Sequence, residues 1–347
     1  MRSLRKPKRL AADKVDTALL GRIAGIRMQS ANNGGDFASS ITLLSKISSR
    51  HSEVSTYRIE TPSGPKYVVA KRVRDPSPRT AEFLQREYDT LQKISQVAGA
   101  GLADTFPNAL LFSPDRIVLS MVAGVSLDGQ LKRTANVLTG WLSTRHITVT
   151  GRQIAEWLGR FHAQIGSDDI GHDHERYATE LDRLLRKCAA FGLTATTLRQ
   201  VREASLRLSR ALQYRTMPAA ASHGDFIPQN ILLHHGKLGV VDFASYSDCA
   251  PVYQDLTHFV GYLLLLGAKP FYSGKRLGVF ASSFLAGYPL TLDGSLLRVF
   301  LIKAVLRLIS DGNPVPTYLS RFRTGNLDSL LLRLTDEQRP LPFGIQL

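Results

Sequence analysis

The chain contains the stretch His223-Gly224-Asp225-Phe226-Ile227-Pro228-Gln229-Asn230, followed after a short spacer by Val240-Val241-Asp242-Phe243. An Asp-x4-Asn motif thus precedes a predicted hairpin, and a second aspartate stands at the end of an apolar strand. Phosphoryl transfer needs a carboxylate that orients and deprotonates an acceptor hydroxyl, a role that Asp225 fits. It also needs oxygen ligands for Mg2+, a role that Asn230 and Asp242 fit. Any one of these residues could equally belong to a turn or cap a strand. The complete set, in this order, favours phosphoryl transfer.

The motif resembles that of the aminoglycoside phosphotransferase and choline kinase family. Its spacing matches the kinase catalytic loop H-R-D-x-x-x-x-N, except that Gly224 replaces the arginine of protein kinases. A third acid, Asp255, follows Asp242 at about the family's distance. The resemblance implies an α+β, protein-kinase-like fold with two lobes, a small antiparallel sheet followed by a mostly helical part. It also implies that Asp255 is a buried acid that braces the loop, and that His223 ties the loop to the backbone.

Hydrophobic patterning predicts three parts: a basic, partly flexible arm over residues 1–40, a nucleotide-binding lobe over 41–122, and a helical lobe over 123–347 that holds the catalytic loop and the substrate site. Alternating apolar residues predict a hairpin of strands 54–59 and 66–73, and a further strand at 117–121. An apolar stripe predicts a helix over 79–95. Further helices are predicted near 154–162, 175–190, 195–213, 252–266, 274–287, 294–310 and 317–334.

Lys71 is the expected phosphate-binding lysine. It stands late in the strand Val68-Val69-Ala70-Lys71, which resembles the kinase element Val-Ala-Ile-Lys, whose lysine holds the α- and β-phosphates of ATP. A carboxylate must fix this flexible side chain. Glu87 on the following helix is the favoured partner, and Glu82 is the alternative.

The rest of the nucleotide site is less distinct in sequence. A phosphate-covering loop is expected at 47–54, where Ser48, Ser49 and Ser52 are equal candidates, although no glycine-rich signature is present. The linker that includes Met121 and Val122 is expected to border the adenine base. Leu232 and Val241 are expected to form the floor under the base. The resemblance implies ATP and Mg2+ as cofactors.

Charge carries information about partners. The formal net charge is +15. The cluster Arg2-Ser3-Leu4-Arg5-Lys6-Pro7-Lys8-Arg9 is expected to make weak contacts with anionic lipid or an acidic partner, or else to be a solvated tail. Residues 130–220 and 265–347 are also basic, which disfavours a polycationic acceptor. We therefore expect a neutral or anionic hydroxyl compound such as a sugar, a nucleoside or a lipid-linked metabolite, with an aminoglycoside-like antibiotic as the remaining acceptor class.

Other functional classes fit the sequence less well. A non-catalytic, nucleotide-binding regulator with a basic docking arm is the main alternative. A protein kinase is disfavoured because no Ala-Pro-Glu element follows Asp242-Phe243. No specific nucleic-acid binding is predicted, since the basic residues lack interleaved aromatic residues. The two cysteines, Cys188 and Cys249, lack metal-type spacing, and neither a signal peptide nor a membrane span is indicated, so a cytoplasmic location is expected.

Overall fold

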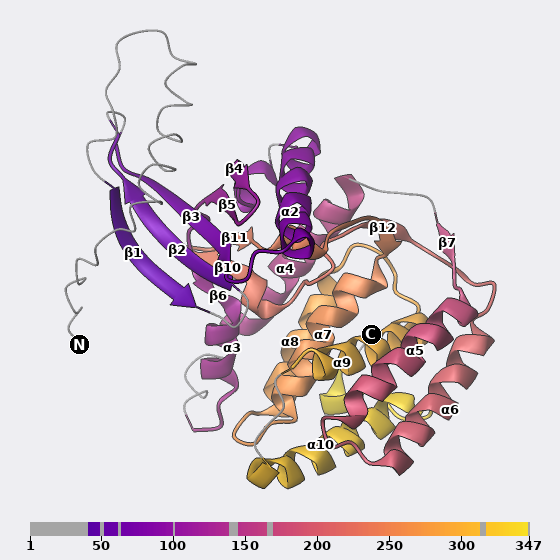
Figure 1. Cartoon of the computed structure of the whole chain (residues 1–347). Coiled ribbons are helices and arrows are strands. Elements are labelled where there is room, and N and C mark those ends of the chain that lie inside the picture. The colour runs from indigo at the N-terminus through magenta and orange to yellow at the C-terminus, as the bar shows by residue number, and fades with distance from the viewer. Residues whose placement is uncertain are drawn as a thin grey trace. The chain divides into compact units, whose positions relative to one another are not determined.

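The computed structural model describes residues 41–48, 52–61, 64–99, 101–138, 145–164, 169–312 and 317–345, with the side chains of 145–147 and 317–325 excepted. The fold is α+β: an antiparallel sheet comes first and a mostly helical region follows (Figure 1). Contacts divide the chain into two compact units. The first comprises the described residues up to Ala123 together with Val241–Ala244, and the second comprises Gly124–Val240 and the described residues from Ser245 onward.

The first unit is built on a five-stranded antiparallel sheet in the order β1-β2-β3-β5-β4. The strands are β1 (Ile41–Ser48), β2 (Ser52–Ile59), β3 (Lys66–Val73), β4 (Ala109–Ser113) and β5 (Arg116–Ser120). Alternation along β2 and β3 buries every second side chain, and the buried set includes Tyr57, Ile59, Val68 and Ala70. This core fixes the register in which Lys71 lies opposite Val54 and Ile117.

Helix α2 (Pro78–Val97) packs on β4 and β5 of this sheet. It begins at the N-cap Ser77, where Ser77 and Thr80 form a reciprocal capping box and Pro78 occupies the first turn. Its buried face includes Leu84, Leu91 and Ile94, and also the carboxylate residue Glu87. A buried acid on an otherwise apolar stripe requires a partner, because an unpaired buried charge is costly.

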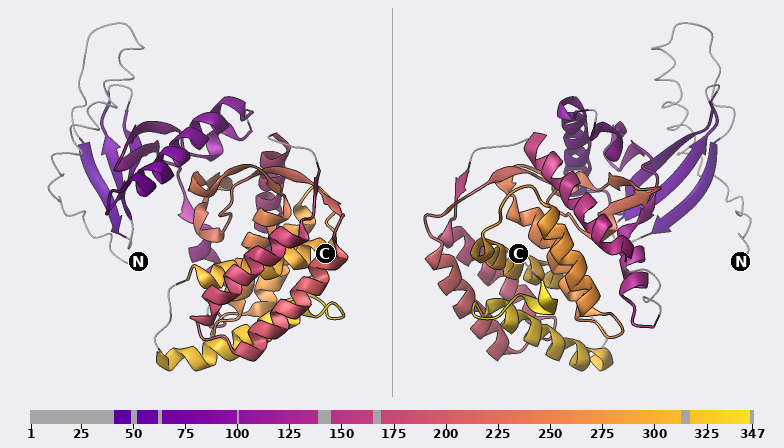
Figure 2. Two further views of the ribbon diagram at one scale, coloured as in Figure 1. Left: turned by 45° about the vertical axis from the view of Figure 1, so that its right-hand side comes forward. Right: turned by 180° about the vertical axis from the view of Figure 1, so that it is seen from behind.

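The second unit is mainly helical. Its helices are α3 (Leu127–Ala135), α4 (Arg145–Gln164), α5 (His174–Ala189), α6 (Ala195–Ala211), α7 (Tyr253–Gly267), α8 (Gly274–Gly287), α9 (Gly294–Ser310) and α10 (Thr317–Thr335). Helix α7 packs against α9, α4 packs against α8, and α5 runs beside α6 (Figure 2). Most residues of α7 and α9 are buried, so these two helices form the centre of the unit. In the part of the chain that is described, no helix is long and apolar enough to cross a membrane.

Short strands in the second unit hold the loops. A three-stranded sheet has the order β11-β10-β6, formed by β11 (Lys237–Val240), β10 (Ile231–His234) and β6 (Val125–Ser126). Strand β12 (Ser247–Pro251) pairs with β9 (Ala219–Ser222), and β7 (Ile170–Gly171) pairs with β8 (Thr216–Met217). The stretch 223–230 therefore lies between two strands that are each tied into a sheet.

The predicted α+β fold with an initial antiparallel sheet is confirmed. The helices also lie where periodicity predicted them, although α4 begins at Arg145 and is longer than the predicted 154–162. Two strands of the sheet, β1 and β4, and the helix α3 had no specific prediction. The basic arm at 1–40 and Ser49 lie outside the described residues.

Candidate active site

Lys71 lies between two carboxylates of the first unit. Its Nζ is 2.9 Å from Glu87 Oε2 and 2.8 Å from Asp242 Oδ1. Glu87 is 1% exposed, whereas the side chain of Asp242 is 41% exposed. The structure thus places Glu87, rather than the alternative Glu82, beside the lysine. The contact with Asp242 was not anticipated from sequence.

The two carboxylates keep Lys71 charged. Burial by itself would lower the pKa of Lys71, but the neighbouring Glu87 and Asp242 outweigh it and raise that pKa above its usual value. For Glu87, burial raises the carboxyl pKa, and attraction to Lys71 opposes this shift. A permanently protonated amine at the end of β3 can attract phosphate groups.

Asp242 is held by its neighbour in sequence. Phe243 is fully buried, and its ring packs edge-on against Phe106 with the centroids 6.0 Å apart. Asp242 itself has a left-handed backbone, with φ of 70°. A non-glycine residue in this region is uncommon and costs of order 1 kcal/mol or more. The buried aromatic side chain therefore fixes a strained turn that presents the Asp242 carboxylate.

The residues expected to bind adenine lie in both units of the chain. Met121 lies just past β5, and its N–H donates to Tyr67 O at 3.1 Å. That N–H is therefore part of the sheet, and the expectation that Met121 borders the adenine base stays a prediction. Val122 and Val241 are half-buried in the first unit. Leu232 belongs to β10 of the second unit, where it lies opposite Ser126.

The expected phosphate-covering loop is only partly described. Ser48 ends β1 and Ser52 begins β2, so the strands flank the predicted segment as expected. Residues 49–51 lie outside the described part of the chain. The choice among the three serines therefore stays open.

Asp225 and Asn230 lie together in the second unit. The Asn230 Nδ2 donates to the Asp225 backbone oxygen at 2.9 Å and to Asp225 Oδ2 at 3.0 Å. A short 3-10 turn at Pro228–Asn230 brings the amide back toward the aspartate. Because the amide nitrogen makes both bonds, the Asn230 carbonyl oxygen is the atom that suits a cation. Asp225 keeps a side chain that is 34% exposed.

Asp255 braces the loop from the first turn of α7. Its Oδ1 accepts from Ser222 Oγ at 3.0 Å and from Gly224 N at 2.9 Å, and its Oδ2 accepts from His223 N at 2.8 Å. His162 Nε2 adds a contact at 3.3 Å to Oδ2. Burial would raise the pKa of Asp255, but the bonds from His162 and the backbone, with attraction to both histidines, outweigh it and lower that pKa. The predicted brace is present.

His223 also holds the loop. It is fully buried, and its Nδ1 accepts from the Asp225 N–H at 3.3 Å. The next aromatic residue, Phe226, stacks on Trp157 of α4 with the ring centroids 5.9 Å apart. Asp225 therefore stands between two fully buried side chains, which fixes where its carboxylate points.

Glycine is required at position 224 by the close approach of the 3-10 turn Phe243–Ser245. Its φ is 78°, and a Cβ at this position would lie 2.0 Å from the Ser245 carbonyl oxygen. No side chain fits there without a shift of backbone. This contact gives a physical reason for glycine, rather than arginine, between the histidine and the aspartate.

We expect Gly224→Ala to destabilise the fold far more than Gly236→Ala. Both glycines have φ of 78°, but a Cβ at Gly236 would meet nothing within 4 Å. The Gly236 change should cost roughly 1–2 kcal/mol, the cost of a left-handed alanine. The Gly224 change adds a backbone collision. Thermal unfolding of both variants measures the difference, and equal melting temperatures would contradict the contact with Ser245.

His258 is the functional candidate that the sequence did not reveal. In the structure it is 4% exposed, its Nδ1 has no hydrogen-bond partner, and that atom lies 3.7 Å from Asp225 Oδ1. It stands three residues after Asp255, so both face the loop from one side of α7. The spacing Asp-x-x-His on a predicted helix was the available signal.

The protonation of His258 predicts a pH dependence of stability. Burial lowers its pKa below the usual 6.5, and attraction to Asp225 only partly opposes this shift. The unfolded chain therefore binds more protons than the folded chain just below pH 6.5, so stability is lost as pH falls through that window. We expect His258→Gln to reduce this loss by at most about 1.4 kcal/mol per pH unit. Melting temperatures at pH 7.5 and 5.5 measure it, with His234→Gln, an exposed site, as control.

A cleft of about 680 Å³ opens beside Asp225 in the second unit. Its polar lining includes Asp225, Gln229, His258 and Tyr262. Gln229 Nε2 donates to the Tyr262 hydroxyl at 2.8 Å, and that hydroxyl donates to Asp128 of α3. The cleft has the size of a small-molecule site, and the carboxylate of Asp225 can reach a hydroxyl placed in it.

Each unit of the chain offers one hard oxygen donor of the kind that Mg2+ prefers. Among the described residues no group of three or more His, Cys, Asp or Glu side chains gathers at one place. Mg2+ needs only one or two carboxylates beside substrate phosphates and water. The exposed carboxylate of Asp242 and the amide oxygen of Asn230 are hard oxygen donors of this kind.

The chain was compared with known proteins. The model of the phosphotransferase enzyme family (APH) matches residues 45–276, which is two thirds of the chain. The chain belongs to this family. It is therefore a small-molecule kinase, and the resemblance inferred from the loop motif is confirmed. A search of the curated proteins found no match.

Solved structures of other phosphotransferases share its fold. A glucosamine kinase is 16% identical with a TM-score of 0.58, covering 90% of this chain and 86% of that one. The aminoglycoside phosphotransferase APH(2")-IIa, in a ternary complex with streptomycin and ATP, is 13% identical with a TM-score of 0.55, covering 93% and 99%. A choline kinase from Cryptosporidium parvum Iowa II is 12% identical with a TM-score of 0.51, covering 92% and 95%. At these identities the likeness shows the fold.

Proposed function

We propose that this phosphotransferase transfers the γ-phosphoryl group of ATP to a hydroxyl of a small molecule, with Asp225 as the group that orients the hydroxyl and accepts its proton. The observation that carries the proposal is the placement of Asp225. Its carboxylate is oriented by Asn230 and faces a cleft of small-molecule size. In-line transfer depends mainly on positioning and charge stabilisation, which a fixed carboxylate supports.

The nucleotide would be held by residues already described. Lys71, fixed by Glu87, would position the phosphates. Asn230 and Asp242 would hold Mg2+, which, when bound, neutralises charge that develops on the transferred group. Asp242 also pairs with Lys71 at 2.8 Å, and that ion pair would loosen when phosphates compete for the lysine.

The acceptor would be neutral or anionic. The charged side chains that line the cleft besides Asp225 are Lys269, Arg307 and Asp311. These two cations and two carboxylates balance, so it is the net charge of +15 on the whole chain that opposes a polycation. A sugar, a nucleoside or a lipid-linked metabolite fits this balance better. An aminoglycoside-like antibiotic is the second class, because APH(2")-IIa is solved with streptomycin and with gentamicin.

We also propose that the protein works in the cytoplasm. Neither the buried Cys188 nor the exposed Cys249 is part of a disulfide, which suits a reducing compartment. The sequence-based division at residues 40 and 122 into an arm and two functional lobes remains part of the proposal. So does a weak docking role for the basic arm.

The proposal is tested by ADP release with a set of hydroxyl compounds. The set pairs neutral sugars and nucleosides with their anionic derivatives and includes an aminoglycoside. We expect turnover that depends on ATP, on Mg2+ and on a neutral or anionic acceptor. Turnover with the aminoglycoside alone would overturn the proposed acceptor class, and nucleotide binding without turnover on any compound would favour the non-catalytic regulator.

A further inference from the structure

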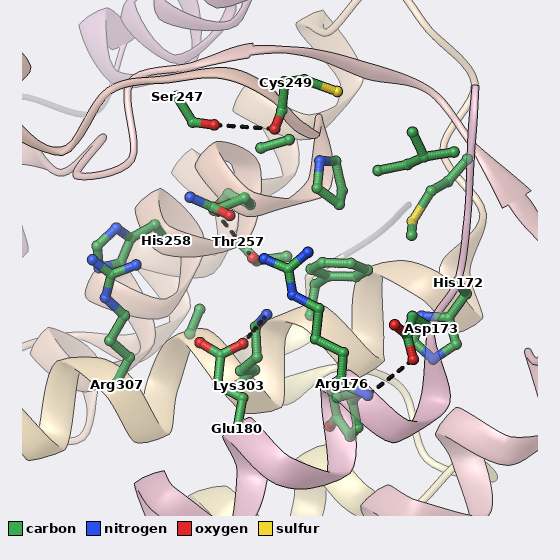
Figure 3. A pocket seen from close by; sticks show the side chains of 18 of the residues that line it. His172, Asp173, Arg176, Glu180, Ser247, Cys249, Thr257, His258, Lys303 and Arg307 are labelled. Atoms are coloured by element: carbon green, nitrogen blue, oxygen red, sulfur yellow. Dashed lines mark hydrogen bonds and ion pairs between the residues drawn. The ribbon is translucent and has the colours of Figure 1, made fainter. Parts of the chain in front are cut away.

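A second cavity of about 350 Å³ lies in the second unit, between the N-terminal half of α5, the C-terminal half of α9 and strand β12. Figure 3 shows Arg176 of α5 and Arg307 of α9 with their guanidinium groups directed into it. Lys303, one turn before Arg307, also lines the cavity. Three cationic side chains from two helices thus converge on one small space.

The two carboxylates that line the cavity, Asp173 and Glu180, each have a partner. Glu180 Oε2 receives the Lys303 ammonium at 2.9 Å, and Asp173 caps α5 by accepting from the Arg176 N–H at 2.9 Å. Arg307 has only a distant contact, 3.8 Å from its Nε to Asp311 Oδ2. The three cations therefore exceed the two carboxylates of the lining by one positive charge, and Arg176 has no ion pair of its own.

A histidine also lines the cavity. This residue, His172, is buried. Burial lowers its pKa, repulsion from His174 and from Lys303 lowers it further, and attraction to Asp173 partly opposes the shift.

The cavity adjoins the cleft that holds Asp225. His258 and Arg307 line both spaces, and His258 Nδ1 is 3.7 Å from Asp225 Oδ1. A molecule that places a hydroxyl at Asp225 can therefore extend past His258 toward the arginines. This shared wall connects the proposed position of phosphoryl transfer to the second cavity, which is called the cationic compartment below.

We propose that the acceptor carries an anionic group, a phosphate ester or a carboxylate, and that Arg176, Lys303 and Arg307 bind it in this compartment. The inference rests on the proposed transfer to a hydroxyl at Asp225. Guanidinium groups bind both anions through paired, charge-assisted hydrogen bonds, and they recognise planar or tetrahedral oxygen pairs better than a lysine does. The compartment selects against polycations for the same reason.

The first test uses thermal unfolding of the full chain with inorganic phosphate or malonate, against sodium chloride at equal ionic strength. Arg176→Gln is the test variant, because Arg176 is exposed and lines the cavity without an ion pair that the change would break. Arg186→Gln is the matched control, since Arg186 is an exposed arginine on the same helix that does not line the cavity. We expect one or both anions to raise the melting temperature of wild type and Arg186→Gln, and the rise to shrink by half or more in Arg176→Gln.

Equal shifts in all three proteins, or none in wild type, would overturn the proposal. Whether phosphate or malonate gives the larger shift decides between the two kinds of anion. The shift with ATP and Mg2+, measured on the same samples, tests the nucleotide site separately. An inactive nucleotide site with an intact phosphate shift would therefore count against the proposed function alone.

The second test compares hydroxyl compounds with and without a phosphate ester or carboxylate as acceptors. We expect wild type to prefer the anionic member of a pair, and Arg176→Gln to lose roughly tenfold or more of that preference in kcat/KM. Arg186→Gln, the matched control, should keep the wild-type preference. An unchanged preference in Arg176→Gln would contradict the assignment.

Discussion

We expect Asp225→Asn to lower kcat by roughly 10²- to 10⁴-fold, the range that a positioned proton acceptor contributes. The amide keeps the size of the carboxylate and a hydrogen bond to Asn230, but it cannot accept the hydroxyl proton. Nucleotide binding should be nearly unchanged, because Lys71, Glu87 and Asp242 belong to the other unit of the chain. Initial rates and the melting-temperature shift with ATP and Mg2+ measure the two effects.

The control for Asp225→Asn is Asp169→Asn, which removes the same charge from an exposed position of the same unit. It should leave kcat within experimental error of wild type. If Asp225→Asn kept full activity with the true acceptor, Asp225 would not be the base. A loss of the ATP shift in this variant would mean that Asp225 holds nucleotide rather than acceptor.

Lys71→Met should affect both stability and activity. It leaves the buried carboxylate of Glu87 without its cation, and breaking a buried pair in this way costs about 3 kcal/mol, at the low end because Glu87 can take up a proton. It also removes the amine that would position the phosphates. We expect a lower melting temperature and a large loss of kcat/KM for ATP.

The double variant Lys71→Met, Glu87→Gln separates the two effects. Removing both charges takes away the uncompensated carboxylate, so much of the lost stability should return. The phosphate-binding amine is still absent, so activity should not. Recovery of activity together with stability would show that Lys71 has a structural role only.

The sequence predicted those parts of the protein that depend on local pattern. Periodicity located the helices from α4 to α10, and alternation located β2, β3 and β5. The motif from His223 to Asp242 led to the family because the order and spacing of its residues are unusual in combination. Glu87 was preferred over Glu82, and the buried face of α2 carries Glu87 because its spacing matches Leu84, Leu91 and Ile94.

The remainder depends on contacts between distant segments, which local pattern does not encode. The collision that requires glycine at 224 comes from Ser245, twenty-one positions away. The Lys71–Asp242 ion pair joins residues 171 positions apart. In the sequence His258 is one residue of an apolar helix, and its approach to Asp225 appears only in the folded structure. Met121 was assigned by its place in a linker, but its N–H completes the pairing of β3 with β5.

The cationic cavity lined by Arg176, Lys303 and Arg307 could not be predicted from local pattern either. Its cations come from α5 and α9, more than a hundred residues apart in the chain, and the sequence revealed only that both regions are basic. Only the folded structure shows which of these cations forms an ion pair with an acid. Glu180 neutralises Lys303 but not Arg176.

The most direct test of the account is thermal unfolding with and without ATP and Mg2+, on wild type and on Asp242→Ala. Asp242 is the proposed metal ligand, and its side chain is partly exposed, so the substitution should leave the fold intact. We predict a rise in melting temperature that requires both ATP and Mg2+ in wild type and is absent in Asp242→Ala. No rise with any nucleotide in wild type, or an equal rise in Asp242→Ala, would contradict the account.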